Sequence, residues 1–470
     1  MSEDTEDAAT GTVRLRFDQG TLVADGALTD ADVSALEALS FRRDSRAGGA
    51  FRAPAQAYRR TLAHLIRAGH TVDDSARQYK ELTLAGRRDR EPYPHQAEAL
   101  AAWWKAGRRG VVVLPTGAGK TYVAEMAIGR VNRSTLVVAP TIDLMNQWMS
   151  VLSVAFGADL VGAVGGGSYD VRPLTVTTYD SAYIHMERLG DRFGLVVFDE
   201  CHHLPGASYA QGAECSIAPF RLGLSATPER SDGGEVRLAH LIGPEVYRRE
   251  IKEMSGRYLA DYDVERLRVQ LTEAERRAYD ASRAVYRAFV VSSGIRLGSP
   301  QGWGQFIMET SRSSEGRAAW RAWREQKRIS LQCEAKLTAL SDLLRLHADQ
   351  QVIVFTADNE TVYTIARRHL IPAITHQTPA LERQTILQDF HAGAVRGVVT
   401  SKVLNEGVDL PTASVGIVLS GSGSVREHVQ RLGRILRKQE GKEATLYEVI
   451  TAETGEEFTS DRRREHGAYR

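Results

Sequence analysis

Short apolar runs, each followed by polar residues, recur between residues 111 and 225 of the chain. The segments between these runs place apolar residues three and four positions apart, which is the spacing of an amphipathic helix. Buried strands that alternate with helices are typical of a parallel sheet covered on both faces. We therefore predict an α/β lobe whose strands are 111–114, 135–139, 174–178, 195–198 and 221–225.

The same alternation returns nearer the carboxyl end of the chain and predicts a second α/β lobe. Its expected strands are 351–355, 373–375, 397–400, 416–419 and 445–450. Between the two lobes the strand pattern gives way to long polar helices, interrupted by glycines such as Gly294 and Gly298. This middle segment is predicted to be a helical insertion.

The first 75 residues predict a small α/β domain of their own. Residues 13–17 alternate as a strand does, and residues 21–23 can pair with them across a turn. Helical spacing follows over 30–39 and 57–68. The many arginines of this region form either a nucleic-acid surface or an ordinary solvated face, and both interpretations stay open at this point.

These patterns divide the chain into five parts. We predict an N-terminal domain over 1–76, a first lobe over 88–250, the insertion over 255–331, a second lobe over 332–455 and a flexible tail over 456–470. The tail is charged and poor in apolar residues. With 470 residues, 43% of them hydrophobic, the chain is too long for one core and too apolar to be disordered.

Charge and cysteine content narrow the picture a little further. The formal net charge of +1 neither indicates nor excludes a nucleic-acid partner, so any basic surface must be local. Three cysteines without paired spacing argue for a reducing compartment and against a disulfide framework. The chain starts with acidic residues, and no apolar run approaches the length of a membrane span. We expect a soluble, cytoplasmic protein that makes no membrane contact.

Residues 111–121, VVVLPTGAGKT, predict a phosphate-binding loop between a buried strand and a helix. Glycines let backbone N–H groups point at an anion, and the helix N-terminus adds partial positive charge. Lys120 can reach the outer phosphates, and the Thr121 hydroxyl can hold Mg²⁺. We therefore expect ATP and Mg²⁺ as cofactors. The loop residues expected to bind the nucleotide are Thr116, Gly117, Ala118, Gly119, Lys120 and Thr121.

Two carboxylates follow the buried strand 195–198, at the end where a bound nucleotide would need them. Asp199 is expected to hold Mg²⁺, and Glu200 to position and deprotonate the attacking water. The neighbouring Cys201, His202 and His203 offer zinc-ligand chemistry as an alternative. Consecutive residues that leave a strand converge poorly on one ion, so the ATPase interpretation is favoured.

The phosphate loop and the paired carboxylates belong to a series of motifs that resembles the superfamily 2 helicases. The resemblance implies two RecA-like parallel-sheet lobes, with Gln96 recognising adenine. It implies that Thr141 and Thr178 contact the nucleic-acid backbone. It also implies that hydrolysis is coupled to motion through His202, Ser225 and Thr227.

In the second lobe the resemblance assigns Thr400 to the nucleic acid, and Gly407 and Asp409 to the nucleotide. It further assigns an arginine-finger motif, whose expected catalytic residues are Gln430, Arg434 and Arg437. The spacing adds independent support, because Arg434 and Arg437 are three residues apart and so share one helical face. Such a finger contributes roughly 10³ to 10⁵ in rate.

The chain resembles the XPB family more closely, and its compact prokaryotic members in particular. Residues 114–121, 198–205 and 419–424 carry this resemblance, which covers nearly the whole chain. It implies that the N-terminal domain is a damage-recognition domain and the insertion a thumb. It also implies a 3′–5′ DNA helicase or duplex translocase, acting on duplex or forked DNA in repair or transcription-linked opening. The expected setting is the prokaryotic nucleoid, with a nuclease as partner protein.

Two departures from the family pattern matter. The family's Asp-Glu-Val-His carries Cys201 here, a change of packing that should spare the chemistry. Its Arg-Glu-Asp motif, tied to strand opening, is Arg230-Ser231-Asp232 in this chain. Arg230 remains a candidate nucleic-acid contact, but the lost carboxylate puts the wedge-like role in doubt.

The insertion carries an arginine stripe, with tryptophans beside it. The stripe residues share one helical face and are Arg317, Arg321, Arg324 and Arg328. Trp320 and Trp323 flank them. Either the arginines bind phosphates while the indoles stack on bases, or the stripe is solvated and the tryptophans anchor the helix. The two interpretations have equal support from the sequence.

The expected function is therefore a nucleic-acid-dependent ATPase that steps along DNA. One rival is an ATP-dependent clamp or assembly factor with little turnover, which the intact catalytic residues disfavour. A second rival is an RNA helicase, since readout of the 2′-hydroxyl decides between DNA and RNA and no residue here reveals it. A motor that carries its own nuclease is disfavoured, because we find no further carboxylate cluster.

Overall fold

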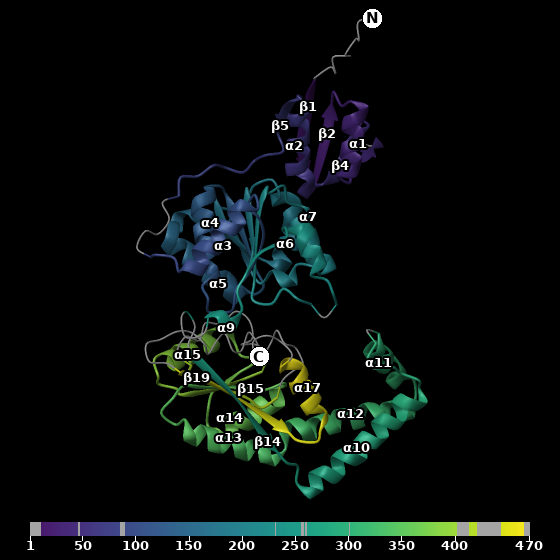
Figure 1. Cartoon of the computed structure of the whole chain (residues 1–470), viewed down its shortest axis with the longest axis vertical. Coiled ribbons are helices and arrows are strands. Elements are labelled where there is room, and N and C mark those ends of the chain that lie inside the picture. The colour runs from purple at the N-terminus through teal and green to yellow at the C-terminus, as the bar shows by residue number, and fades with distance from the viewer. Residues whose placement is uncertain are drawn as a thin grey trace, which may run out of the picture. The chain divides into compact units, whose positions relative to one another are not determined.

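The computed structural model describes residues 11–45, 48–84, 90–230, 232–254, 258, 261–299, 301–401, 413–420 and 443–464. The chain divides into two compact units (Figure 1). One comprises Met1–Leu114 and Gly119–Arg249, and the other comprises Glu250–Arg470 together with the loop segment Pro115–Ala118.

The N-terminal domain is a five-stranded sheet in the order β3-β4-β2-β1-β5. Its elements are β1 Thr12–Asp18, β2 Thr21–Gly26, α1 Asp30–Ala38, β3 Arg42–Asp44, β4 Ala50–Pro54, α2 Tyr58–Arg67 and β5 Thr71–Asp74. The predicted hairpin and both predicted helices are confirmed. Thr29 begins α1 with a capping box, in which it exchanges hydrogen bonds with Asp32 and so satisfies N–H groups of the first turn.

The first lobe is an eight-stranded sheet in the order β13-β6-β12-β11-β7-β10-β8-β9. All neighbouring strands are parallel except β8 and β9. Its strands are β6 Arg109–Val113, β7 Thr135–Ala139, β8 Val161–Gly165, β9 Ser168–Tyr169, β10 Leu174–Thr178, β11 Leu195–Phe198, β12 Phe220–Ser225 and β13 Glu245–Arg248. The five strands predicted from the sequence are confirmed within one or two residues.

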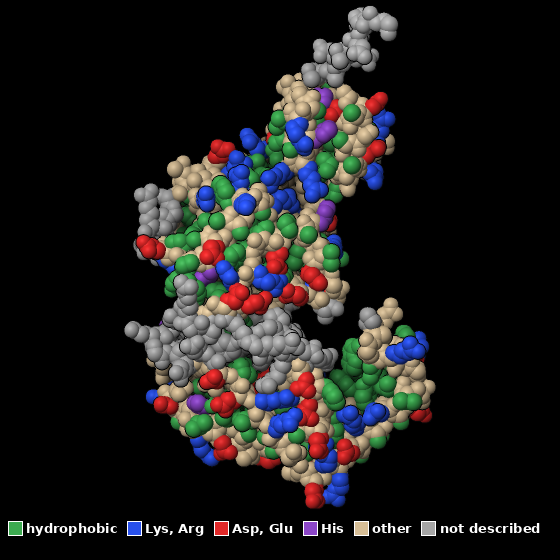
Figure 2. Space-filling view, in the orientation of Figure 1, with side chains coloured by type: hydrophobic (Ala, Val, Ile, Leu, Met, Phe, Trp, Pro, Cys, Tyr) green, Lys and Arg blue, Asp and Glu red, His purple; other side chains and the backbone are tan. Residues whose placement is uncertain are grey.

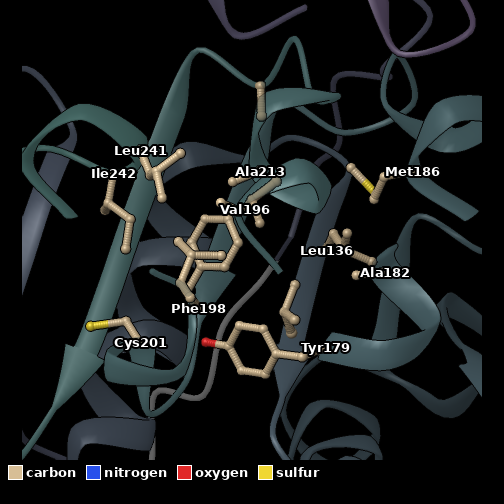
Figure 3. Close-up of a cluster of buried hydrophobic side chains, with 14 of the residues drawn as sticks. Leu136, Tyr179, Ala182, Met186, Val196, Phe198, Cys201, Ala213, Leu241 and Ile242 are labelled. Carbon is tan, nitrogen blue, oxygen red and sulfur yellow. The ribbon is translucent and has the colours of Figure 1, made fainter. Parts of the chain in front are cut away.

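Helices cover both faces of this sheet, with α3 and α4 on one side and α6 and α7 on the other (Figure 1). The helices are α3 Pro94–Lys105, α4 Lys120–Val131, α5 Ile142–Phe156, α6 Tyr179–Leu189, α7 Ala207–Glu214 and α8 Val236–Leu241. Leu136, Val196 and Phe198 of the sheet pack with Tyr179 and Met186 of α6 in a buried cluster (Figure 3). Burying each large apolar side chain contributes about 1.5–3 kcal/mol.

The second lobe is a six-stranded parallel sheet in the order β14-β19-β18-β15-β17-β16. Its strands are β14 Asp261–Val269, β15 Val352–Phe355, β16 Ala373–Ile374, β17 Gly397–Thr400, β18 Val415–Val418 and β19 Glu443–Thr451. The helices on this lobe are α9 Ile251–Met254, α13 Glu334–Leu346, α14 Asn359–His369, α15 Ala380–His391 and α17 Gly455–Arg464. The insertion contributes α10 Glu273–Ser292, α11 Gly302–Arg312 and α12 Ser314–Gln332.

Two predictions about this half of the chain were wrong. The expected helical insertion begins at 255, yet residues 261–269 form edge strand β14, which pairs in parallel with β19. The strand is rich in charged residues, as exposed edge strands commonly are, and this hid its apolar alternation.

The expected flexible tail, 456–470, is helical up to residue 464. Glu456 accepts a hydrogen bond from the buried Lys336 at 2.7 Å, and the Ser460 hydroxyl donates to Glu448 at 3.2 Å. These contacts lie one helical turn apart and hold α17 on the lobe. The tail's low content of apolar residues therefore misled the prediction, because the anchoring contacts are polar and buried.

Candidate functional site

The predicted site residues of the first lobe gather at one edge of its sheet. Strands β6, β12, β11, β7 and β10 are neighbours and parallel, so their carboxyl ends meet at this edge. Ligands of open α/β sheets bind at this edge. Thr178 and Ser225 end their strands here, and Lys120, Thr141 and Asp199 come after theirs.

The phosphate loop has the backbone that the sequence predicts. Gly117 and Gly119 have φ angles of 87° and 83°, in the left-handed region that favours glycine. Lys120 opens α4, and its Nζ donates to the Leu114 carbonyl at 3.2 Å. Thr121 follows in the first turn of the helix. A glycine-bent loop that ends on a helix N-terminus, with a lysine beside it, is suited to hold a nucleotide phosphate.

Gln96 packs directly against this loop. A Cβ added at Gly119 would collide with the Gln96 side-chain nitrogen, so only glycine leaves room for both. The Gln96 side chain is buried, and its Oε1 accepts from the Tyr93 backbone N–H at 3.0 Å. This bond closes the capping box of α3. The predicted adenine-recognising residue is therefore fixed at the edge of the phosphate loop.

Asp199 is buried at the end of β11 and held from several sides. Its Oδ2 accepts from the Trp148 indole at 2.8 Å, and its Oδ1 accepts from the Glu200 backbone N–H at 3.0 Å. Burial raises the pKa of the Asp199 carboxyl, while the Trp148 bond and the Lys120 charge oppose that rise. A fixed carboxylate near a lysine fits a Mg²⁺–nucleotide complex, with Asp199 and the Thr121 hydroxyl as the protein groups that would hold the ion.

Glu200 adopts a left-handed backbone, with φ of 45°. Such a conformation is costly for a non-glycine residue and is common at functional sites. It directs the carboxylate back toward the phosphate loop, where Oε1 lies 4.0 Å from Lys120 Nζ. Oε2 lies 3.5 Å from His202 Nδ1. The structure thus brings the expected base, the loop lysine and the coupling histidine together.

His202 links the end of β11 to the end of β12. Its Nδ1 lies 3.2 Å from Ser225 Oγ, and that oxygen accepts from the Thr227 backbone N–H at 3.1 Å. The His202 side chain is completely buried. The three residues expected to couple hydrolysis to motion therefore form one connected group beside Glu200.

Arg230 belongs to the same group. Its Nη1 donates to the His202 carbonyl at 2.7 Å, and Nε and Nη2 donate to the Asp232 carboxylate at 2.8 and 2.6 Å. Nucleic-acid binding by Arg230 stays a prediction, because these bonds occupy its guanidinium within the protein. Ser231 lies outside the described residues.

Sequence reasoning missed Trp148 as part of the site, and it placed Tyr179 in a motif that contacts the nucleic-acid backbone without foreseeing its contact with Asp199. The Tyr179 hydroxyl donates to the Asp199 carbonyl at 2.9 Å. Both aromatic residues lie on the buried faces of α5 and α6, where their spacing is that of ordinary core residues. No local signal distinguishes a core tryptophan from one that donates to a site carboxylate.

The zinc alternative finds no support in the described part of the chain, where no group of three or more His, Cys, Asp or Glu side chains could hold a metal ion among themselves. Cys201 is fully buried, and burial raises the pKa of its thiol far above its usual value. A buried neutral thiol is a packing residue rather than a reactive one.

Thr141 and Thr178 begin two helices at the same edge of the sheet. Each side chain accepts a backbone N–H three residues on, from Leu144 and from Ser181, both at 3.2 Å. These hydrogen bonds cap α5 and α6, whose N-termini carry partial positive charge. Two such helix ends beside each other suit phosphate groups of a nucleic acid, and contact of Thr141 and Thr178 with nucleic acid stays a prediction.

In the second lobe, Thr400 ends β17 with its side chain buried. Its backbone carbonyl accepts from the Thr356 N–H at 2.9 Å. The other residues predicted for this lobe lie outside the described residues: Gly407, Asp409, Gln430, Arg434 and Arg437.

In the insertion, the arginine stripe lies along the exposed face of α12. The tryptophans beside it are packed together. Trp320 stacks on Trp323, with ring centroids 5.1 Å apart, and Trp303 of α11 lies 4.9 Å from Trp323. The indoles thus fasten α11 to α12, which favours the anchoring interpretation for Trp320. The four arginines are exposed, and Arg328 donates to the Glu325 carboxylate at 2.9 and 2.7 Å.

Within the described residues, no helix is both long and apolar enough to span a membrane.

Three family models match parts of this chain. Residues 15–76 match the "Xeroderma pigmentosum group B helicase damage recognition domain", residues 89–230 match "Type III restriction enzyme, res subunit", and residues 318–467 match "ERCC3/RAD25/XPB C-terminal helicase". Together they span the N-terminal domain and most of both lobes.

Among curated proteins, the chain is 42% identical to the DNA 3′-5′ translocase XPB2 of Sulfurisphaera tokodaii, over 79% of this chain and 84% of the relative. It is 32% identical to the DNA 3′-5′ helicase XPB of Kineococcus radiotolerans, over 79% of this chain and 62% of the relative. Among solved structures, the helicase domain of Pyrococcus furiosus Hef matches 79% of this chain and 98% of its own length, with a TM-score of 0.55 and 20% identity. The last likeness shows the fold alone.

Proposed function

Since this chain belongs to the XPB family of superfamily 2 helicases, we propose that it is a DNA-dependent ATPase that moves 3′ to 5′ along DNA and opens it. The proposal covers three points: the hydrolysis of ATP, DNA as the nucleic acid, and the use of the motion in repair or transcription-linked opening.

One observation supports the hydrolysis most directly. Lys120, Asp199 and Glu200 come from two separate loops, yet they meet at the carboxyl edge of the sheet, with Lys120 Nζ 4.0 Å from Glu200 Oε1. A phosphate loop, a metal-binding carboxylate and a base are the parts that phosphoryl transfer to water requires. A structural loop without this chemistry has no need of a buried carboxylate or of a strained backbone at Glu200.

The residues of the chain divide the work as follows. The loop amides and Lys120 bind the phosphates, and Gln96 holds the base side of the nucleotide. Glu200 accepts a proton from the attacking water at its carboxylate. Thr121 and Asp199 would hold Mg²⁺, which would supply charge neutralisation at the phosphates.

The nucleic acid is proposed to contact both units. In the first, the N-termini of α5 and α6 offer partial positive charge at Thr141 and Thr178. In the second, a cavity of about 450 Å³ lies between α12 and the start of α14. Its lining carries four cations and three carboxylates: Arg321, Arg324, Lys327, Arg328, Glu325, Asp358 and Glu360. Glu325 pairs with Arg328, so Arg321 and Arg324 are the arginines proposed to meet phosphates. Exposed arginines around a hollow suit a phosphate backbone.

Two rivals remain distinct from this proposal. A clamp that binds ATP and DNA without turnover would not need Glu200 next to Lys120, so the geometry disfavours it. An RNA helicase would use the same ATP site, so only a nucleic-acid assay separates the two. A nuclease partner is part of the proposal, because we assign no cutting site to the chain itself.

The deciding experiment measures ATPase rate with single-stranded DNA, duplex DNA and RNA side by side. We expect DNA to raise the rate at least tenfold above the rate without nucleic acid. Stimulation by RNA alone would contradict the DNA assignment, and absence of stimulation by any nucleic acid would favour the clamp. A fluorescent strand-displacement assay on 3′- and 5′-tailed duplexes then tests direction.

A further inference from the structure

The N-terminal domain docks against the amino edge of the first lobe's sheet, the edge opposite the phosphate loop. The Arg59 Nη1 of α2 donates to the Gly107 carbonyl at 2.8 Å and to the Pro219 carbonyl at 3.2 Å. Gly107 precedes β6, and Pro219 precedes β12. The side chain of Ile217, from the lobe, is buried in the core of the N-terminal domain.

This junction contains a cleft of about 270 Å³. The N-terminal domain contributes Gln56 and Arg60 to its lining, and the lobe contributes Arg109, Glu214 and His240. A water molecule occupies about 30 Å³ in the liquid. The cleft therefore has room for a phosphate-sized group together with a few waters.

Positive charge outweighs negative charge in the lining of the cleft, which carries Arg60, Arg109 and Glu214. Arg109 is largely buried, and its only hydrogen bond among the described residues is from Nε to the Ile242 carbonyl at 3.0 Å. Burial, followed by repulsion from Arg59 and Arg60, lowers the pKa of Arg109 to about 10. Arg221, behind it, is fully buried and bonds to backbone carbonyls, among them those of Ala213 and Ser216.

The one carboxylate that lines the cleft, Glu214, has a cation of its own. Its Oε1 lies 3.9 Å from Arg237 Nη2. Docking the two domains thus sets the exposed Arg60 of α2 against the largely buried Arg109 of the lobe. Like charges held close where solvent screens them poorly are costly unless an anion compensates them. Figure 2 shows Lys and Arg side chains gathered where the N-terminal domain meets the lobe.

The polar lining of the cleft is also incomplete. Gln56 Nε2 lies 2.9 Å from His240 Nε2, while the buried Gln56 Oε1 has no hydrogen-bond partner among the described residues. If the Gln56 amide is flipped, its Oε1 accepts a hydrogen bond from the Nε2–H of His240. The Gln56 –NH₂ group is then the one without a partner among the described residues. In that arrangement an N–H donor is available beside two guanidinium groups.

We propose that this cleft binds a phosphate group, held by Arg60 and Arg109 between the N-terminal domain and the first lobe. The phosphate neutralises the repulsion across the junction and so strengthens the docking of the two domains. This phosphate belongs either to a nucleic-acid backbone or to a free phosphorylated solute. Both present negatively charged phosphate oxygens to the arginines. The proposal does not depend on the ATPase activity, because the cleft and the phosphate loop lie at opposite edges of the sheet.

The test uses the full chain with saturating ADP and Mg²⁺, so that the phosphate loop is filled. Inorganic phosphate is titrated in a thermal unfolding assay, with potassium chloride at equal ionic strength as reference. A tenfold excess of phosphate over its dissociation constant should raise Tm by about 1.5–3 °C. Arg60→Gln and Arg109→Gln should each remove the rise. Arg67→Gln, on the exposed side of the same helix, should keep it.

Arg60 is exposed, so Arg60→Gln should fold normally even if Arg109→Gln does not. An equal rise in wild type and Arg60→Gln, or no rise beyond that with chloride, would overturn the proposal. Duplex DNA binding at several salt concentrations identifies the source of the phosphate. The quantity compared is the slope of log DNA affinity against log salt concentration, called the salt slope. A decrease of about 0.9 in the magnitude of this slope in Arg60→Gln supports a backbone phosphate. An unchanged slope together with lost binding of inorganic phosphate supports a free solute.

Discussion

His202 Nδ1 lies 3.2 Å from Ser225 Oγ, and so a completely buried imidazole connects the strand that carries Glu200 to the neighbouring strand β12. The same nitrogen lies 3.5 Å from Glu200 Oε2. A movement of the Glu200 carboxylate can therefore be transmitted to β12 through the His202 side chain. Family resemblance assigns these residues to the coupling of hydrolysis to motion. Their contact offers a physical route for that coupling within the first lobe.

The first prediction concerns this contact. Ser225→Ala should keep ATP binding but lower strand displacement more than it lowers ATPase rate, because the hydroxyl that meets His202 is lost. His202→Ala should do the same, and the two changes should be non-additive by about 0.5–3 kcal/mol in a double-mutant cycle. Ser150→Ala, on the outer face of α5, is the control. Additive effects would show that His202 and Ser225 act independently and would contradict the prediction.

The second prediction concerns the base. Glu200→Gln should leave ATP and DNA binding intact and lower the hydrolysis rate by roughly 10²–10⁴, because the amide cannot accept the proton of the attacking water. Single-turnover hydrolysis measures the chemical step. The exposed Glu187→Gln should behave as wild type. Hydrolysis by Glu200→Gln within a few-fold of wild type would remove Glu200 from the mechanism.

The third prediction uses the contact between Gly119 and Gln96. Gly119→Ala should weaken ATP binding at least tenfold, because its Cβ displaces the Gln96 amide and its left-handed φ disfavours alanine. Fluorescent nucleotide titration gives the affinity. Gly298→Ala, where an added Cβ meets nothing within 4 Å, is the matched control. Adding Gln96→Ala to Gly119→Ala should relieve the collision without restoring affinity, since the backbone strain remains.

The fourth prediction concerns the arginine stripe of α12. Changing Arg317, Arg321, Arg324 and Arg328 to Ala should weaken DNA binding and reduce the salt slope by up to about three units, at roughly 0.7–0.9 per lost phosphate contact. ATP affinity should not change. Trp320→Ala should instead lower the melting temperature, because Trp320 packs with Trp303 and Trp323. An unchanged slope in a folded quadruple variant would leave the stripe a solvated face.

The fifth prediction concerns pH and the N-terminal domain. Burial by itself would raise the pKa of Asp32, but hydrogen bonds from Thr29, His70 and His64 outweigh it and hold that pKa far below its usual value. A carboxyl whose pKa is lower in the folded state stabilises the fold fully above its unfolded pKa of about 3.9. This contribution starts to decline as pH falls below that value and is lost only as pH falls through the lower, folded pKa.

Asp32→Asn should therefore destabilise the protein clearly at pH 7 and by a smaller but still measurable amount at pH 3. Denaturant unfolding of both proteins at the two pH values gives the difference. Asp30→Asn, a carboxyl of the same first helical turn, should show a much smaller dependence, since its side chain is exposed. An equal effect of Asp32→Asn at pH 7 and pH 3 would contradict the linkage.

The sequence by itself determined the central strands of both lobes and the phosphate loop. Residues 111–121 carry their own strand, glycine bend and helix start, so the local chain specifies the cradle. Asp199 and Glu200 were predictable for the same reason, because they directly follow a strand that is apolar throughout. Continuous apolar runs identify strands that are buried on both faces, whatever their neighbours.

Only the tertiary structure decided the rest. Trp148 became a partner of Asp199 because α5 packs beside β11, although 51 residues separate them. Strand β14 is positioned by pairing with β19, and helix α17 is positioned by the buried ion pair of Lys336 and Glu456. Local composition reveals neither contact. Likewise, the charged residues around Arg109 line a common cleft only because the N-terminal domain packs against the first lobe. Contacts between distant segments depend on how whole elements pack, and a pattern read over a few turns of chain carries no record of them.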